Sequence, residues 1–117
     1  HWWHADNDTS RITNTFARAV EQEIPLIVGE FAHKRVGCEG TIAYRHLMKE
    51  AARLDVGWLA WSWGPGNSDC AGMDMTEDGT VQTLHGWGRD VALTDSFSIR
   101  HTATRPSSMT AGTCSAE

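Results

Sequence analysis

Two short apolar runs of this sequence each end in residues that could take part in chemistry. Residues 25–31 deliver one carboxylate, that of Glu30, near the C-terminal end of the run. Residues 57–63 deliver two indoles, those of Trp61 and Trp63, at the same end. A carboxylate can stabilise positive charge that develops on a sugar carbon, and a flat indole can cover the apolar face of a sugar ring. Together they are typical of a site that binds and cleaves saccharides.

The elements that must position these residues are predicted to be two parallel strands joined by a helix. Both sides of residues 25–31 are apolar at a period of two, which is typical of a strand buried on both faces of a parallel sheet. Residues 41–54 have helical spacing, and further helices are predicted at residues 10–23 and 83–93. This alternation with short connections predicts an α/β fold. Two parallel strands cannot bury both faces of a sheet unaided, so we expect an incomplete sheet.

Glu30 lies at the edge of the predicted sheet that carries the active site in α/β barrels. Its carboxylate is costly to remove from water unless it is hydrogen-bonded, paired with a cation or used in a reaction. A functional carboxylate is therefore one interpretation. A structural ion pair with the neighbouring Lys34 or Arg35 is the alternative.

The indoles of the second strand divide between its two sides. At a period of two, Trp61 and Trp63 share one side, and Trp58 takes the other, where packing against helices is the simpler role. Ser62 lies in a sequence similar to the nucleophile elbow of serine hydrolases. That motif requires a helix directly after the serine, whereas a loop beginning Gly-Pro-Gly-Asn follows here, so this reading is the weaker alternative.

The three cysteines do not indicate a disulfide-rich scaffold. Cys38 and Cys70 each fall in a loop after a predicted strand, so the two could form a disulfide, which would be typical of a secreted protein. Three unpaired thiols remain the alternative, because spacing alone does not decide pairing. Cys114 lies in a tail of small residues.

The composition argues against several classes of binding partner. The chain has 117 residues and a net charge of −5, which argues against nucleic acid binding, since phosphate contacts need a basic face. No run approaches the roughly 18 apolar residues of a membrane span. His1 and His4 have a spacing seen in zinc sites but lack a third ligand nearby, so no metal and no cofactor are expected. Six tryptophans against one tyrosine favour stacking surfaces.

Residues 24–31 followed by residues 57–63 resemble the seventh and eighth strands of glycoside hydrolase family 5, and are closest to its bacterial endo-β-1,4-mannanases and related cellulases. The segment Leu-His-Gly-Trp-Gly at residues 84–88 also resembles the closing helix of that family. The resemblance covers residues 1–109 and implies the C-terminal portion of a TIM (β/α)8 barrel, about strands 6–8 with their helices. Residues 110–117 are then expected to be a tail or linker.

The resemblance also implies roles for single residues. Glu30 would be the catalytic nucleophile, and Trp61 would line the subsite of the sugar that is attacked. His1 matches the histidine at the end of the sixth strand. Trp3 falls where the family usually has a tyrosine that donates a hydrogen bond to the nucleophile. Trp63 completes the predicted substrate-binding residues.

The implied reaction is retaining hydrolysis of a β-1,4-linked polysaccharide, with mannan, glucan and xylan left open. The family's acid/base glutamate, which follows an asparagine, has no counterpart in this sequence, so the isolated chain is expected to be inactive. The complete protein is expected to be secreted and monomeric. A non-catalytic carbohydrate-binding domain is the alternative function, although such modules are mostly all-β.

Overall fold

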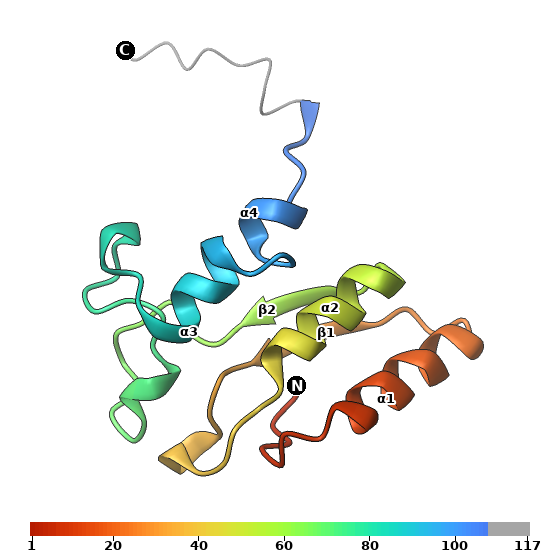
Figure 1. Cartoon of the computed structure of the whole chain (residues 1–117), viewed down its shortest axis with the longest axis horizontal. Coiled ribbons are helices and arrows are strands. Elements are labelled where there is room, and N and C mark those ends of the chain that lie inside the picture. The colour runs from red at the N-terminus through yellow and green to blue at the C-terminus, as the bar shows by residue number, and fades with distance from the viewer. Residues whose placement is uncertain (108–117) are drawn as a thin grey trace.

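The computed structural model describes residues 1–107, which form a two-stranded parallel sheet with helices packed against it (Figure 1). Cys114 and the predicted tail at residues 110–117 lie outside the described residues. The α/β order predicted from the sequence is confirmed. The main elements are α1 (Thr9–Glu21), β1 (Ile27–Phe31), α2 (Tyr44–Leu54), β2 (Gly57–Ala60), α3 (Gly86–Arg89) and α4 (Ile99–Thr102).

Helix α1 begins where the sequence offers a capping side chain. The carboxylate of Asp8 accepts hydrogen bonds from the backbone N–H groups of Ser10 at 2.9 Å and Arg11 at 3.3 Å. These donors lie among the N–H groups that a helix leaves unpaired at its N-terminus, and the hydrogen bonds from Ser10 and Arg11 lower the pKa of Asp8. Ile12 and Phe16, one turn apart, are buried on the face that meets α2.

Helix α2 is the crossover that makes β1 and β2 parallel. Its buried face contains Tyr44, Leu47, Met48 and Ala51, the four residues that have helical spacing in the sequence. The register pairs Val28 with Trp58, and an irregularity follows before the next pair.

A third parallel segment lies on the other edge of β1. Trp2 forms an isolated parallel bridge with Phe31, and its N–H donates to the carbonyl oxygen of Glu30 at 2.7 Å. Phe31 also pairs with Ala60 of β2, so β1 lies between the N-terminal segment and β2. The C-terminal ends of three parallel segments therefore meet at one edge.

One face of this sheet carries the core and the other has no cover among residues 1–107. The side chains of Val28 and Phe31 are buried, whereas Ile27 is 61% exposed and Leu59 is 58% exposed. Within the described residues the two strands thus do not bury both faces of the sheet, as expected from the sequence.

Several predicted boundaries differ from the structure, and two of these differences bear on the site and the last helix. The second strand was expected to reach Trp63 but ends at Ala60, because the backbone beyond it pairs with a later loop: Ser62 N–H donates to the carbonyl oxygen of Met73 at 3.1 Å. The helix expected at residues 83–93 begins at Gly86, and its second half is a π-helix, η4 (Asp90–Thr94).

Candidate active site

A cavity of about 270 Å³ lies at the C-terminal ends of β1 and β2. Glu30 reaches it from the end of β1, and Trp61 reaches it from the residue directly after β2. Trp3, from the N-terminal parallel segment, forms another wall. The structure therefore brings together three of the predicted site residues, and we call this space the Glu30 cavity.

The side chain of Glu30 is held by His1. The Nδ1 atom of His1 lies 2.9 Å from Oε2 of Glu30, whose side chain is 21% exposed. Within residues 1–107 the side-chain contact to this carboxylate comes from His1, and not from Trp3 at the position of the family's tyrosine. His1 thus contacts one of the two carboxylate oxygens of Glu30.

The structural ion pair considered for Glu30 does not form. Arg35 pairs instead with Glu39 at 2.9 Å, and the ammonium group of Lys34 donates to the hydroxyl of Thr41 at 3.3 Å. The carboxylate that ends β1 is thus not used as a partner for either neighbouring cation.

Trp61 is held by a polar network that sequence reasoning missed. Its Nε1 donates to the side-chain oxygen of Asn67 at 3.0 Å. The amide nitrogen of Asn67 donates in turn to the carboxylate of Asp74 at 2.5 Å, and Asp74 is buried. Gly64 has φ +71, and a Cβ there would lie 2.8 Å from the Asp74 side chain. A single acidic residue between two apolar ones, Met73 and Met75, was the signal in the sequence.

Trp63 lies elsewhere, so the prediction that it shares a site with Trp61 is wrong. Its Nε1 donates to the carbonyl oxygen of Gly79 at 2.6 Å, and its ring lines a separate cavity of about 300 Å³ with Trp58 and Ile99. The reason is that β2 ends at Ala60, so period-two alternation does not extend to residue 63. A substrate-binding role for Trp63 stays a prediction without support from its position.

Ser62 has no general base as the hydrogen-bond partner of its hydroxyl among residues 1–107. Its hydroxyl accepts a hydrogen bond from the side-chain amide of Asn67 at 2.8 Å. An amide cannot remove a proton from the hydroxyl, which a serine nucleophile requires. The serine-hydrolase alternative is therefore not supported.

A disulfide joins the two loops that border the Glu30 cavity. Cys38, in the loop after β1, is bonded to Cys70, in the loop after β2, at a sequence separation of 32. Val36 and Cys70 both line the cavity. Closing a loop of this length contributes about 3–4 kcal/mol in the chain-entropy model, so the disulfide stabilises the cavity wall.

Within residues 1–107, no group of three His, Cys, Asp or Glu side chains is placed to hold a metal ion. None of the helices in the same range combines the length and the apolar composition that a bilayer crossing requires.

Curated relatives were found by sequence, although no family model matches the chain. A mannan endo-1,4-beta-mannosidase of Salipaludibacillus agaradhaerens is 27% identical over 88 residues, which cover 75% of this chain and 28% of the relative. A second protein of that name, from Cellvibrio japonicus, is 28% identical over 92% of this chain and 26% of its own length. The chain therefore spans less than a third of the length of these relatives.

Solved structures give the same result. The β-mannanase of Thermomonospora fusca matches with a TM-score of 0.79 and 29% identity, over 89% of this chain and 33% of that one. The β-mannanase of Streptomyces thermolilacinus, solved with mannohexaose, matches with a TM-score of 0.76 and 27% identity, over 92% and 34% of the two chains. These relatives are TIM barrels, of which the present α/β fold matches about a third. By sequence and by fold, the chain is thus similar to part of the mannanases of glycoside hydrolase family 5, and the resemblance to that family is confirmed.

Proposed function

We propose that the Glu30 cavity is part of a retaining glycosidase site that acts on β-1,4-linked mannan. The observation that carries this proposal is a carboxylate at the end of β1, held 2.9 Å from His1, in one cavity with the indole of Trp61. Two curated relatives are named as mannan endo-1,4-beta-mannosidases, which favours mannan. A third is named a β-mannanase/endoglucanase, so glucan is the alternative substrate.

In the proposed mechanism, Glu30 is the nucleophile. Its free carboxylate oxygen forms a bond to the anomeric carbon while the bond to the leaving glycosidic oxygen breaks, and that oxygen takes a proton from a general acid. Water then attacks the glycosyl-enzyme, and retention of configuration follows from the two displacements. His1 holds the carboxylate in position, and Trp61 covers the apolar face of the sugar.

The proton donor is the part that this cavity does not supply. Retaining enzymes place two carboxyl groups about 5–5.5 Å apart. Among residues 1–107, Glu30 is the one glutamate that lines the cavity. The other carboxylate there is that of Asp69, which is exposed in the loop after β2. Loss of a general acid/base typically lowers a rate by about 10²–10⁴-fold. We therefore propose that the 117-residue chain does not hydrolyse mannan measurably.

A covalent trap tests the role of Glu30 without needing a general acid. The reagent is a 2-deoxy-2-fluoro-β-mannosyl donor with a dinitrophenolate leaving group. The dinitrophenolate departs without needing a proton, and the fluorine slows hydrolysis of the glycosyl-enzyme. We expect one equivalent of the fluoromannosyl group on Glu30, located by peptide mass mapping, and no label on Glu30→Gln. A label on another residue, or none at all, would contradict the assignment.

The acid/base proposal has a separate control. Mannan hydrolysis by the unmodified chain that disappears in Asp69→Asn would show that Asp69 supplies the proton and that the inactivity proposal is wrong. Binding of mannan without any covalent labelling would favour the alternative, a carbohydrate-binding domain without catalysis. The corresponding glucosyl donor, tested in parallel, distinguishes mannan from glucan.

We also propose that the protein is secreted and acts as a monomer. The Cys38–Cys70 disulfide supports secretion, because such bonds persist mainly in oxidising compartments. Extraction of the native protein with and without a thiol-blocking reagent would show whether this bond exists before purification.

A further inference from the structure

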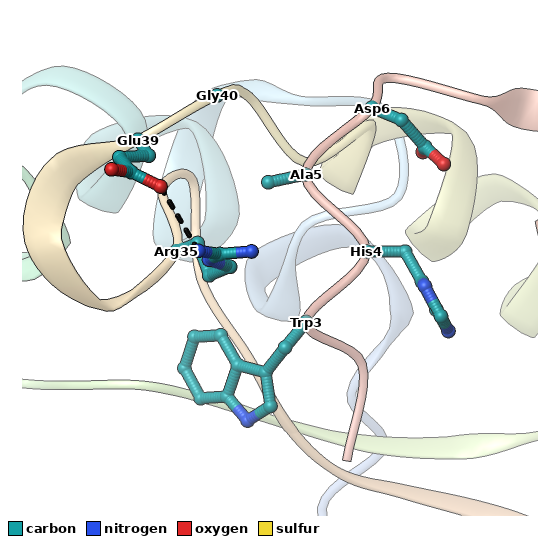
Figure 2. A pocket seen from close by; sticks show the side chains of 7 residues that line it. All are labelled: Trp3, His4, Ala5, Asp6, Arg35, Glu39 and Gly40. Atoms are coloured by element: carbon teal, nitrogen blue, oxygen red, sulfur yellow. Dashed lines mark hydrogen bonds and ion pairs between the residues drawn. The ribbon is translucent and has the colours of Figure 1, made fainter.

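Residues 35–39, in the loop after β1, form an exposed surface segment that we call the clamp loop. Its polar contacts are internal. The guanidinium group of Arg35 pairs with the carboxylate of Glu39 at 2.9 Å, and the N–H of Cys38 donates to the carbonyl oxygen of Arg35 at 2.9 Å. Figure 2 shows the ion pair within this one segment. Apart from the chain itself, the disulfide to Cys70 is the one bond that joins the clamp loop to other residues among 1–107.

The clamp loop is loosely packed on the side that faces the N-terminal segment. A hollow of about 380 Å³ lies there, lined by Arg35 and Glu39 on one side and by Trp3 and Ala5 on the other (Figure 2). Side chains beside an open space have few atoms to contact, so packing contributes little to holding the loop on this side. The chain is anchored again at Thr41, whose N–H donates to the carbonyl oxygen of Ala5 at 3.1 Å.

The backbone of the clamp loop has a conformation that needs support. Gly37 has φ +81, and the next residue, Cys38, has φ +60. A residue with a Cβ atom rarely adopts a positive φ, and such a conformation persists where the surrounding structure enforces it. Because the disulfide is the bond that holds Cys38 from outside the loop, we expect this residue to leave the conformation when the disulfide is broken.

The other half of the disulfide belongs to a loop with its own supports. Cys70 is 2% exposed, and its N–H donates to the carbonyl oxygen of Asn67 at 2.9 Å. Its carbonyl oxygen accepts from the N–H of Met73 at 2.9 Å. The buried carboxylate of Asp74 accepts hydrogen bonds from both the backbone and the side chain of Asn67. The disulfide thus joins a weakly held loop to a firmly held one.

Both loops contribute to the wall of the Glu30 cavity. Val36 of the clamp loop and Cys70 of the loop after β2 line this cavity together with Trp61. While the disulfide is intact, Val36 is held at the wall. Once the bond is broken, the clamp loop has to be ordered again whenever a ligand binds, and that ordering costs free energy.

We propose that the Cys38–Cys70 disulfide is a redox-sensitive clamp, which completes the wall of the Glu30 cavity only in an oxidising compartment. The inference rests on the proposed function, because it concerns the regulation of that same site. In the reducing cytosol the two cysteines are thiols and the clamp loop is free. After export the disulfide forms and holds Val36 at the cavity wall.

Opening of the clamp is a thiol–disulfide exchange. A thiolate of an external dithiol attacks Sγ of Cys38, because Cys38 is exposed whereas Cys70 is 2% exposed. The bond between the two sulfur atoms breaks, and Sγ of Cys70 leaves as a thiolate that takes a proton from water. The second thiol of the reagent then displaces Cys38 from the mixed disulfide. The two cysteines have gained two electrons and two protons, and the reagent has become a cyclic disulfide.

Hydrogen exchange detected by NMR tests the release of the clamp loop. The N–H groups of Arg35 and Cys38 are hydrogen-bonded inside this loop, so their exchange reports its state. In the 117-residue chain we expect both to exchange about tenfold faster after reduction with dithiothreitol and to recover after reoxidation, while β1 and α2 keep their rates. Unchanged exchange at Arg35 and Cys38 would overturn the clamp. Equal acceleration throughout β1 and α2 would also overturn it, because the disulfide would then hold the whole fold.

Titration calorimetry tests the effect of the clamp on the cavity. We expect the affinity for β-1,4-linked mannopentaose to fall about tenfold on reduction, since one or two side chains must then be ordered on binding. A variant with both Cys38→Ser and Cys70→Ser should have the lower affinity with and without dithiothreitol. Cys114→Ser is the matched control, because it removes the third thiol and keeps the disulfide. It should respond to reduction as the unmodified chain does.

The outcomes separate this inference from the proposed function. The same mannopentaose affinity in both redox states would overturn redox control of the cavity and leave the proposed function standing. An affinity that falls on reduction and recovers on reoxidation supports both. Absence of mannopentaose binding in either state, together with no covalent labelling of Glu30, would overturn the proposed function and redox control of saccharide binding with it. Loss of the response in Cys114→Ser would assign the effect to another disulfide and overturn the clamp.

Discussion

Trp61 is positioned by residues that come after it in the chain rather than by its strand. Its indole N–H donates to Asn67, and Asn67 is held by the buried carboxylate of Asp74. A ring that covers a sugar must keep one orientation, because each reorientation costs part of the contact area. At the scale of single residues, Asn67 is thus a positioning residue for the proposed site.

Removing that amide has an expected and measurable result. Asn67→Ala should lower the free energy of unfolding by about 1–3 kcal/mol, because Asp74 and the Trp61 indole both lose a partner. Affinity for mannopentaose should also fall. Thermal unfolding and titration calorimetry would measure the two effects.

The control for this substitution is Asn14→Ala on the exposed side of α1. It should change stability by no more than about 0.7 kcal/mol, the range of helix propensity, and leave saccharide affinity unchanged. Equal effects of the two substitutions would contradict the positioning role of Asn67.

At the scale of elements, one acidic residue joins α2 to the π-helix η4. Asp90 accepts hydrogen bonds from the hydroxyl of Tyr44 at 2.8 Å and from the hydroxyl of Thr94 at 2.8 Å, and it also pairs with Arg45. Burial acts to raise the pKa of Asp90, but these hydrogen bonds and the charge of Arg45 outweigh it and lower the pKa below 3.8. Burial, with the hydrogen bond to Asp90, raises the pKa of Tyr44.

The sign of the pH dependence follows from the lowered pKa of Asp90. Its contribution to stability is complete above about pH 4 and is lost as the pH falls from there through the pKa of the folded state. We expect the difference in free energy of unfolding between the unmodified chain and Asp90→Asn to be constant near neutral pH and to shrink below pH 4. Urea titrations at several pH values would measure it.

Tyr44→Phe is the companion variant, because it removes one donor and keeps the carboxylate. Its stability should depend less steeply on acid than that of the unmodified chain. Curves for all three proteins that run parallel between pH 6 and pH 2 would contradict the link between α2 and η4.

At the scale of the whole molecule, the helices cover one face of the sheet and the described residues leave the other bare. Leu59 of β2 is 58% exposed, whereas Leu47 of α2 is completely buried. Leucine therefore occurs both in the core and on the uncovered face of the sheet. Burial of apolar surface stabilises a fold roughly in proportion to the area removed from water.

Matched leucine substitutions would measure this asymmetry. Leu47→Ala should cost about 2–5 kcal/mol, since it leaves a cavity in the core. Leu59→Ala should cost less than about 1 kcal/mol, because most of its surface is already in contact with water. Chemical denaturation provides both values, and a large cost at Leu59 would mean that other chain segments or a second molecule cover that face.

Local patterns in the sequence determined the main helices and strands. They also determined that Glu30 and Trp61 lie at the same edge of the sheet. The buried faces of α1 and α2 follow from helical spacing, and β1 from its apolar run, because each pattern repeats over neighbouring residues. Short crossovers then require parallel strands, which places Glu30 and the residue after β2 at the same edge. Glu30 and Trp61 could be predicted together for that reason.

Contacts between distant segments were decided by the tertiary structure alone. The pairing of His1 with Glu30 depends on the parallel bridge between Trp2 and Phe31. The hydrogen bond from Trp61 to Asn67 and the separation of Trp63 depend on backbone pairing beyond the end of β2. For Cys38 and Cys70 the sequence left a disulfide and free thiols as alternatives, and the structure shows the disulfide. Neighbouring residues along the chain determine whether a residue prefers a helix or a strand. The side chain that contacts it from a distant segment is determined by the conformation of the loops. That physical difference is why the sequence identified the carboxylate and the indole, and the fold identified what holds them.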